Sequence, residues 1–495
     1  MRRSVLIGAA ILAAAVVFIV ALIAFAGDTA VTAARFSAIR SDHTALRGFL
    51  QRMPKGADLH VHLSGAVYAE DLIVWGKAKN LCFDLPTYSI TDKNCGTATA
   101  PNIADALNPD NRGSQPLYDR MVDALSMRFF LPNAENPSGH DEFFAAFGRF
   151  GGVTWLIPAE MTAAMLKHYA AEGVQHTELM VTLLPYDFGP KLLASIAGVA
   201  GNEERLKRLR DGDLDKAVVE ATKAIDGWVK RINDILGCDA QRTQTGCAVS
   251  YKYIAQVNRN ADEANVFMQT AFAAALIRAD KRVAGLNFVG PEDYRIARED
   301  YGRHMAMIGF LAKDVPVALH AGELWIGLVP PQDLTFHIRQ AVEIAGARRI
   351  GHGVALGYER RSNELLDVMR RKPVAIEINL TSNDVILGVS GSDHPLMSYW
   401  ETGVPVVLST DDMGVSRVDL TNEYLRAARD YPLGYRELKA IARNSIEFSF
   451  LDAAEKEAEA RKLDQACAGF ERAIASERSL LRNIGMLVAG LLRWP

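Results

Sequence analysis

An α/β barrel of the (β/α)8 TIM type is the fold that the sequence predicts, because short apolar runs alternate with helical patterns along most of the chain. Several of these runs are apolar throughout, as parallel strands covered on both faces are. Histidine and aspartate residues stand where some runs end, which suits the carboxyl-terminal face of such a barrel. The eight expected strands are Ala57–Leu63, Thr177–Leu184, Ala248–Val257, Gly285–Val289, Val315–His320, Arg349–Gly351, Val374–Asn379 and Val404–Ser409.

Helical patterns fill the gaps between these strands. The clearest covers residues 261–279, where Asp262 is placed to cap the helix and an apolar stripe recurs at helical spacing. Residues 334–345 and 362–371 show the same kind of pattern. The chain from Tyr435 onward is expected to be mostly helical.

Composition limits the classes of function. The chain has 495 residues, of which 49% are apolar and 23% charged, and this is enough apolar material for a large buried core. The formal net charge is −4, so neither nucleic acid nor an anionic surface is expected as a partner.

The first 26 residues are predicted to direct export. Arg2 and Arg3 precede an unbroken apolar run from Val5 to Ala26, and this order is typical of an export signal. Small residues end the run, where a signal peptidase would cut. The run is also long enough, at ~20 residues, to span a bilayer. Residues 1–26 are therefore expected to be a signal peptide or, through residues 4–26, a retained membrane anchor.

The rest of the chain is expected to form one barrel domain with additions. Residues 27–53 are predicted to be an N-terminal helical extension, and residues 54–495 the barrel itself. Two insertions are expected, at about residues 82–150 and 188–247. The first is rich in turn residues, and the second is charged and helical.

The five cysteines fit an exported protein. Cys82 and Cys95 lie 13 residues apart in a polar loop, and Cys238 and Cys247 lie 9 apart around another. Both pairs are predicted to form local disulfides in an oxidising compartment, which clip the two insertions. Cys467 is left over and is expected to be free.

Four side chains at strand ends predict one divalent metal site. His60 and His62 are separated by one residue on the first strand, so their side chains point to the same face, the barrel interior. His320 ends a later apolar run, and Asp411 closes the last one. Parallel barrel strands bring their carboxyl ends to one rim, where three imidazoles and a carboxylate could share a metal ion.

Three further groups are candidates for acid–base chemistry. Glu323 follows His320 in the next loop, and His352 stands between two glycines that let a substrate approach. Asp412 adjoins Asp411, and adjacent carboxylates repel each other unless a cation or a donor holds them. A metal on one and a substrate nitrogen on the other would do so. Together the groups indicate a hydrolytic enzyme.

These motifs resemble those of the adenosine deaminases in the metal-dependent (amidohydrolase) superfamily. The resemblance covers roughly residues 54–451. The leader, the cysteine-bearing insertion and the total length are most similar to the secreted, growth-factor-related branch. The segments that carry the resemblance are His-x-His-Leu-x-Gly at 60–65, His-Ala-Gly-Glu at 320–323, Gly-His-Gly at 351–353, Thr-Ser-Asn at 381–383 and Ser-Thr-Asp-Asp at 409–412.

The resemblance implies one zinc ion per chain, held by His60, His62, His320 and Asp411. It also implies the roles of the remaining groups. Glu323 protonates the purine ring at N1, and His352 orients and deprotonates the water that the metal activates. Asp412 contacts that water or the ring nitrogen N7, and the backbone of Gly290 holds the ring at N3.

The resemblance has two departures. Many relatives have an aspartate, which holds a ribose hydroxyl, where this chain has Ser64, so Ser64 puts sugar recognition in question. Met413 stands where a proline commonly follows the aspartate pair. The implied activity is hydrolytic deamination of adenosine or deoxyadenosine outside the cytoplasm, in the periplasm or the extracellular space.

Two alternatives stay open, a deaminase of another aminopurine such as adenine or a modified nucleoside, and a non-catalytic nucleoside-binding or signalling barrel. For an adenosine deaminase, the expected small-molecule partner is a purine nucleoside. Whether the chain forms a homodimer is left open by the sequence.

Overall fold

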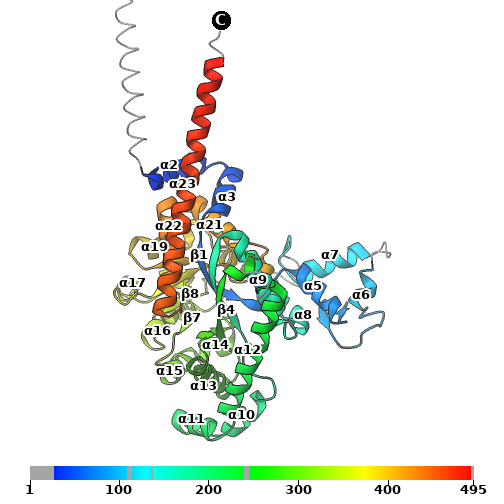
Figure 1. The fold of residues 1–495 in the computed structure, drawn as a ribbon. Coiled ribbons are helices and arrows are strands. Elements are labelled where there is room, and N and C mark those ends of the chain that lie inside the picture. Colours follow the sequence, from blue (N-terminus) through cyan, green and yellow to red (C-terminus); the bar gives the residue numbers. More distant parts are fainter. Residues whose placement is uncertain (1–26, 109–113, 133, 135–137, 239–244, 492–495) are drawn as a thin grey trace, which may run out of the picture.

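Eight parallel strands form the centre of the computed structural model, which describes residues 27–108, 114–132, 134, 138–238 and 245–491 (Figure 1). The predicted leader of residues 1–26 lies outside the described residues. The strands form two four-stranded sheets, of order β1-β4-β5-β6 and β10-β9-β8-β7. Their bounds are β1 (Gly56–His62), β4 (Val174–Val181), β5 (Ser250–Asn258), β6 (Val283–Val289), β7 (Ala318–Ala321), β8 (Arg349–His352), β9 (Ala375–Ile378) and β10 (Val406–Leu408).

Two parallel bridges join the sheets into a closed barrel. Val61 of β1 pairs with Asp411 just after β10, and Leu286 of β6 pairs with Val317 just before β7. The backbone N–H of Asp411 donates to the His60 carbonyl at 2.9 Å. Closure confirms the predicted barrel and brings the first and last strands side by side at their carboxyl ends.

The strands are buried on both faces, as their apolar composition predicts. Residues of β7, β8, β9 and β10 are all buried. All eight predicted strands occur, but β4 begins at Val174, three residues before the predicted Thr177. His176 and Glu178 are polar residues in that strand, and both are buried inside the protein. The polar residues Gln175 and His176 hide the first part of the strand from an apolar pattern.

Helices cover the outside of the barrel. The larger ones are α5 (Ala69–Ala78), α9 (Pro158–Glu172), α12 (Leu214–Leu236), α13 (Glu263–Ala279), α15 (Tyr301–Leu311), α16 (His337–Glu343), α17 (Ser362–Arg371), α18 (Leu380–Leu387), α19 (Leu396–Glu401), α21 (Leu420–Asp430) and α22 (Tyr435–Glu447). Short helices at strand ends are α4 (Leu63–Ala66), α14 (Arg295–Glu299) and α20 (Met413–Ser416). Four 3-10 turns occur at Thr245–Ala248, Pro331–Leu334, Val354–Tyr358 and Gly391–Asp393.

The clearest predicted helix is confirmed together with its cap. Asp262 precedes α13, and its carboxylate accepts the backbone N–H of Asn265 at 3.1 Å. The helix predicted over residues 362–371 is α17. The helix predicted over 334–345 is shorter, because Phe336 has a non-helical backbone and α16 begins only at His337.

The segments predicted to be insertions, at about residues 82–150 and 188–247, contain their own helices and strands. The first contains a hairpin of β2 (Cys82–Asp84) and β3 (Ser89–Thr91), then α6 (Ile103–Ala106), α7 (Ser114–Ala124) and α8 (Gly139–Thr154). It lies to one side of the barrel in Figure 1. The second contains α10 (Gly189–Ile196), α11 (Asn202–Asp211) and α12. Disulfides join Cys82 to Cys95 and Cys238 to Cys247, as predicted, and Cys467 is free and buried.

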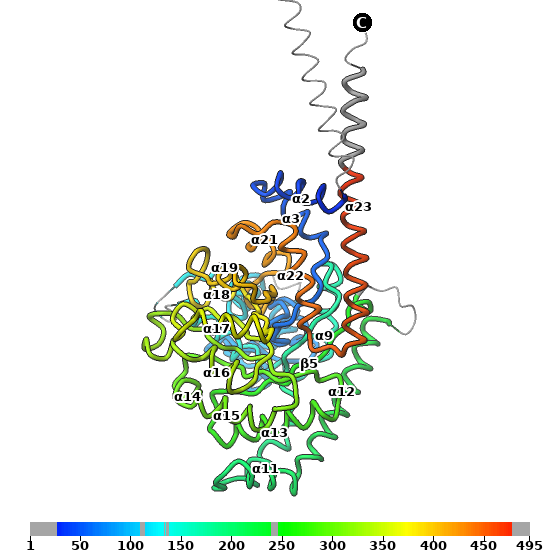
Figure 2. The backbone as a smooth tube through the Cα atoms, turned by 90° about the vertical axis from the view of Figure 1, so that its left-hand side faces the viewer, coloured from blue at the N-terminus to red at the C-terminus, as the bar shows by residue number. Residues whose placement is uncertain are grey.

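The two ends of the described chain meet at one end of the barrel. Residues 28–52 form α2 (Asp28–Ile39) and α3 (His43–Arg52), and α2 packs on the long helix α23 (Ala453–Leu491). The Thr29 hydroxyl donates to Glu471 of α23 at 2.8 Å. Figure 2 shows the coloured part of α23 running alongside the barrel as far as α2. None of the described helices is long and apolar enough to cross a membrane.

Candidate active site

Four predicted ligands converge at the carboxyl ends of the strands. His60 and His62 come from β1, His320 from β7, and Asp411 follows β10. The Nε2 atoms of His60 and His62 each lie 3.0 Å from Nε2 of His320 and 3.4 Å from Oδ1 of Asp411. The potential ligand atoms of these residues all lie within 4.8 Å of one another.

The donor set fits a divalent cation. Oδ1 of Asp411 is buried and has no hydrogen-bond partner among the described residues. Burial and the neighbouring imidazoles hold the pKa of His320 well below its usual value, which keeps the ring in the neutral form that a metal requires. Three imidazoles and one carboxylate are the nitrogen and oxygen ligands that Zn²⁺ accepts. A cation would satisfy all four groups at once.

Hydrogen bonds beneath the cluster aim the imidazoles. Nδ1 of His60 lies 2.6 Å from Oε2 of Glu377, and Nδ1 of His320 lies 2.9 Å from Oδ1 of Asn287. Each ring therefore gives its Nδ1 hydrogen to an oxygen and turns the Nε2 lone pair toward the site. Arg349 ion-pairs with Glu377 and also with Glu178, the latter at 2.6 Å.

Sequence reasoning missed these supporting residues. Glu377 and Glu178 lie in the middle of strands, where the surrounding apolar residues conceal them. A charged residue inside a strand that is otherwise fully apolar is the available signal, because such a charge needs a partner. Here Arg349 supplies that partner.

Glu323 stands above the cluster in a turn held by another carboxylate. The carboxylate of Glu292 accepts the backbone N–H groups of Gly322 and Glu323, at 3.0 and 2.8 Å. Burial, reinforced by the charge of Asp411, raises the pKa of Glu323 well above its usual value. This shift favours the protonated form of Glu323, which can donate a proton to a bound molecule.

His352 and Asp411 adopt strained backbone conformations at the site. Their φ angles are 68° and 59°, in the left-handed region that residues other than glycine rarely occupy. His352 is fully buried, with Nε2 at 3.8 Å from Oδ2 of Asp411 and Nδ1 at 3.4 Å from Oε1 of Glu323. The Ser382 hydroxyl donates to Oδ2 of Asp411 at 2.7 Å. The strain places both side chains over the metal cluster.

Asp412 lies against the small helix that follows β1. A Cβ atom on Gly65 would approach Oδ1 of Asp412 to 1.8 Å, so only glycine leaves room for this carboxylate. Burial and the neighbouring charge of Asp411 raise the pKa of Asp412 well above its usual value. The structure thus brings together all seven predicted metal-binding and acid–base residues.

A cavity of about 590 Å³ opens onto this cluster. Ser64, Gly290, Glu323 and Asp412 line it, together with the exposed edge of the metal cluster. Its outer wall is aromatic, from Phe143, Phe144 and Phe147 of α8 and from Trp155, and amide side chains from Gln256, Asn258, Asn260 and Gln269 face it. Among the described lining residues there is no lysine or arginine. No local sequence pattern predicts the α8 wall, because α8 belongs to a segment that packs back against α4, α18 and α20.

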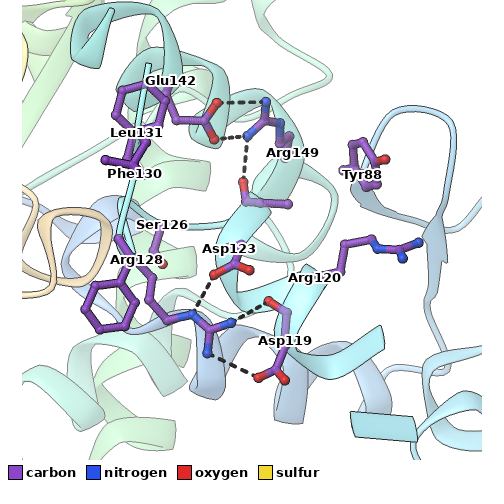
Figure 3. Close-up of a pocket in the computed structure, with 12 residues that line it drawn as sticks. Tyr88, Asp119, Arg120, Asp123, Ser126, Arg128, Phe130, Leu131, Glu142 and Arg149 are labelled. Carbon is purple, nitrogen blue, oxygen red and sulfur yellow. Dashed lines mark hydrogen bonds and ion pairs between the residues drawn. The ribbon is translucent and has the colours of Figure 1, made fainter. Parts of the chain in front are cut away.

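A second hollow, of about 680 Å³, lies on the first insertion (Figure 3). Five of its six charged groups are paired with one another. Arg128 binds Asp119 and Asp123, at 3.3 and 2.6 Å, and Arg149 binds Glu142 at 3.2 Å. No predicted site residue lines this hollow, and its sixth charged group is Arg120.

The closed barrel and the His/Asp cluster at the carboxyl ends of its strands define a metal-dependent barrel hydrolase. A family model described as "Adenosine deaminase" matches residues 217–466, just over half of the chain. The chain therefore belongs to the adenosine deaminase family.

The alignments with curated relatives cover different shares of those proteins. An adenosine deaminase of Enterococcus faecalis is 35% identical over 153 residues, which are 31% of this chain and 42% of that protein. An adenosine deaminase of Salmonella paratyphi C is 26% identical over 329 residues, or 63% of this chain and 90% of that protein. The first match thus spans about two fifths of its relative.

Solved structures share the fold at low identity. An adenine deaminase from Arthrobacter aurescens superimposes with a TM-score of 0.53 and 17% identity, covering 83% of this chain and 98% of that one. An Arabidopsis N6-mAMP deaminase gives a TM-score of 0.53 and 18% identity, covering 84% and 99%. These likenesses support the barrel fold.

Proposed function

We propose that this chain hydrolyses adenosine or deoxyadenosine to inosine or deoxyinosine and ammonia, with one zinc ion on the His60, His62, His320 and Asp411 cluster. The observation that carries the proposal is a buried carboxyl group, Glu323, that lines the same cavity as a metal-type cluster and whose surroundings raise its pKa. A simple metal-binding protein has no use for a proton donor placed there. When bound, zinc would lower the pKa of a water molecule to about 7 and so supply a nucleophile at neutral pH.

The chain's own residues account for the protons. The attacking oxygen forms a bond to C6 of the purine, and Glu323 donates its proton to N1 as that ring nitrogen gains charge. His352 and Asp412 flank the cluster, so one can accept the proton of the water while the other orients it. The bond from C6 to the amino nitrogen then breaks as the nitrogen takes up the proton held by the accepting group and leaves as ammonia, and the second hydrogen of the former water passes from the C6 oxygen back to Glu323.

The lining of the cavity favours a nucleoside over a nucleotide. A phosphate carries negative charge that must be paired once it leaves water. No described residue of the lining is a lysine or arginine, whereas the amides of Gln256 and Asn260 suit uncharged hydroxyl groups. We therefore propose that the group on the purine is a neutral sugar, held by these amides in the absence of an aspartate at position 64.

Steady-state kinetics on four compounds test the substrate. We expect kcat/KM to be highest for adenosine and deoxyadenosine, and at least ~10²-fold lower for AMP because its phosphate would be unpaired. A clear preference for adenine would overturn the nucleoside assignment in favour of the free base. Complete inactivity of folded, zinc-loaded protein on every compound would favour a non-catalytic binding barrel.

We also propose that the protein acts outside the cytoplasm, as a member of the secreted branch of the family. The positively charged, apolar leader and the two local disulfides support this location. Cell fractionation with N-terminal sequencing separates a cleaved signal, whose product begins near Gly27, from a retained anchor. A cytosolic chain that begins at Met1 and has five free thiols would contradict export.

A further inference from the structure

A buried chain of hydrogen bonds leads from the backbone of α19 to His352. The backbone N–H of Leu396 donates to Nδ1 of His394 at 3.1 Å. Nε2 of His394 lies 3.1 Å from Oδ1 of Asn383, and Nδ2 of Asn383 lies 2.9 Å from Nδ1 of His352. All four residues are buried, so water does not compete for these groups.

The backbone N–H of Leu396 begins this series of hydrogen bonds and fixes the direction of every bond in it. The N–H of Leu396 can only donate, so Nδ1 of His394 must accept and carries no hydrogen. Burial lowers the pKa of His394 to about 3, so the ring is neutral and its one hydrogen is on Nε2. That hydrogen requires an oxygen, which sets the amide of Asn383 with Oδ1 toward His394. Its NH2 group then faces His352 and donates to Nδ1.

The opposite orientation of the Asn383 amide is incompatible with the hydrogen bond from the backbone of Leu396. If the amide of Asn383 were turned over, its NH2 group would face Nε2 of His394, which would then have to accept. The hydrogen of His394 would move to Nδ1 and meet the N–H of Leu396 at 3.1 Å, donor against donor. A buried clash of this kind leaves two donors unsatisfied, which is strongly unfavourable away from water.

Other polar neighbours of His352 are more distant. Oε1 of Glu323 lies 3.4 Å from Nδ1, against 2.9 Å for Asn383. The amide of Asn379 lies 3.4 Å from both ring nitrogens and so favours neither. The shortest contact, from Asn383, therefore decides which ring nitrogen carries the hydrogen.

We propose that Asn383 and His394 are positioning residues that hold His352 with its hydrogen on Nε2, so that His352 offers an N–H to the attacking oxygen. The catalytic consequence rests on the proposed deaminase function. A donor at Nε2 orients the lone pair of the oxygen toward the purine. With a hydrogen on Nε2, His352 cannot accept the proton of the water there, so another group at the site accepts it. The resemblance to the family implies instead that His352 removes that proton, so the relay reassigns the role of this residue.

The hydrogen on His352 is observed directly by ¹⁵N NMR of histidine-labelled, zinc-loaded protein, with His352→Gln to identify the signal. We expect Nε2 to carry the hydrogen in the wild type. In Asn383→Asp, an ionised carboxylate can only accept, so we expect the hydrogen to move to Nδ1. A wild-type ring with its hydrogen on Nδ1 would overturn the proposal, whether or not the protein deaminates adenosine.

Kinetics test the consequence of the relay. Asn383→Asp should lower kcat by at least ~10²-fold, the low end for groups that act on protons in catalysis, with metal content and KM little changed. His394→Leu, which removes the donor but keeps most of the volume, should lower kcat in the same direction. His394→Gln should recover much of the loss, because its amide can accept from Leu396 and donate to Asn383.

Ser392→Ala is the matched control, since Ser392 is exposed two residues before His394. It should behave as the wild type does. Unchanged kcat in Asn383→Asp with the hydrogen shown to be on Nδ1 would overturn the catalytic role. If Asn383→Asp does not fold, equal activities of His394→Leu and His394→Gln would overturn it as well.

Discussion

Glu377 accepts the Nδ1 hydrogen of His60 at 2.6 Å inside the barrel, where both side chains are completely buried. The bond fixes the ring so that Nε2 faces His62, His320 and Asp411. A carboxylate behind a metal-binding imidazole also raises its basicity. Glu377 therefore holds the ring of His60 in the orientation that metal binding needs, although Glu377 is not itself one of the four ligands.

Replacing this carboxylate should weaken metal binding. Glu377→Gln keeps the shape but gives His60 a weaker and less directional partner, so we expect zinc affinity to fall about 10–100-fold. Competition with a chromogenic chelator measures the affinity. Glu364→Gln, at an exposed position on α17, is the control and should bind zinc normally. Equal affinities of the two variants would show that Glu377 does not support the metal.

Glu323→Gln should remove the proton donor without disturbing the site. The amide is isosteric and neutral, as the protonated acid is, so the fold and metal content should not change. We expect kcat to fall at least ~10²-fold, as for the loss of a general acid. Glu343→Gln, an exposed carboxylate on α16, is the control. Near-normal turnover of Glu323→Gln would mean that another group protonates the ring.

Gly351 gives His60 the space it occupies. A Cβ atom at position 351 would lie 2.4 Å from Cε1 and 2.7 Å from Nδ1 of His60, so Gly351→Ala should push the ring out of the cluster. We expect about 1–3 kcal/mol of destabilisation together with reduced zinc content. Gly357→Ala is the control, because no atom lies within 4 Å of its added Cβ. Thermal unfolding and metal analysis report both effects, and a Gly351→Ala protein with full zinc content would contradict the close packing.

The barrel should lose stability in acid through Glu178. Burial alone would raise the pKa of this carboxyl, but Arg349 and His176 outweigh it and lower the pKa to about 2 from 4.5. The unfolded chain therefore binds more protons between these values, so this contribution to stability is complete above pH 4.5 and is lost as the pH falls toward 2. Urea unfolding across this range should show a steeper decline in the wild type than in Glu178→Gln. Parallel declines would exclude Glu178 as a source of the acid sensitivity.

The apolar strands and the strand-end motifs carry most of what could be predicted from the sequence. Runs such as residues 404–409 are apolar enough to be recognised locally, and His60 and His62 share a face because strand side chains alternate. The supporting layer could not be predicted in this way. The contacts of Glu377 and of the α8 phenylalanines join residues far apart in the chain, and no periodic pattern encodes such contacts.

For Asn383, the sequence predicts membership of a motif but not the contacts that give the residue its role. The sequence places it in a Thr-Ser-Asn segment that matches the family, yet says nothing of its partners. Its role depends on the backbone of Leu396 and the ring of His394, which only the folded chain brings beside His352.

The most direct test of the central claim is to follow adenosine by ultraviolet absorbance with purified zinc-loaded protein while ammonia is measured in the same sample. The account predicts that inosine and ammonia form in equal amounts. It also predicts that a chelator stops the reaction and that added Zn²⁺ restores it. Folded protein with full zinc content that forms neither inosine nor ammonia would contradict the account.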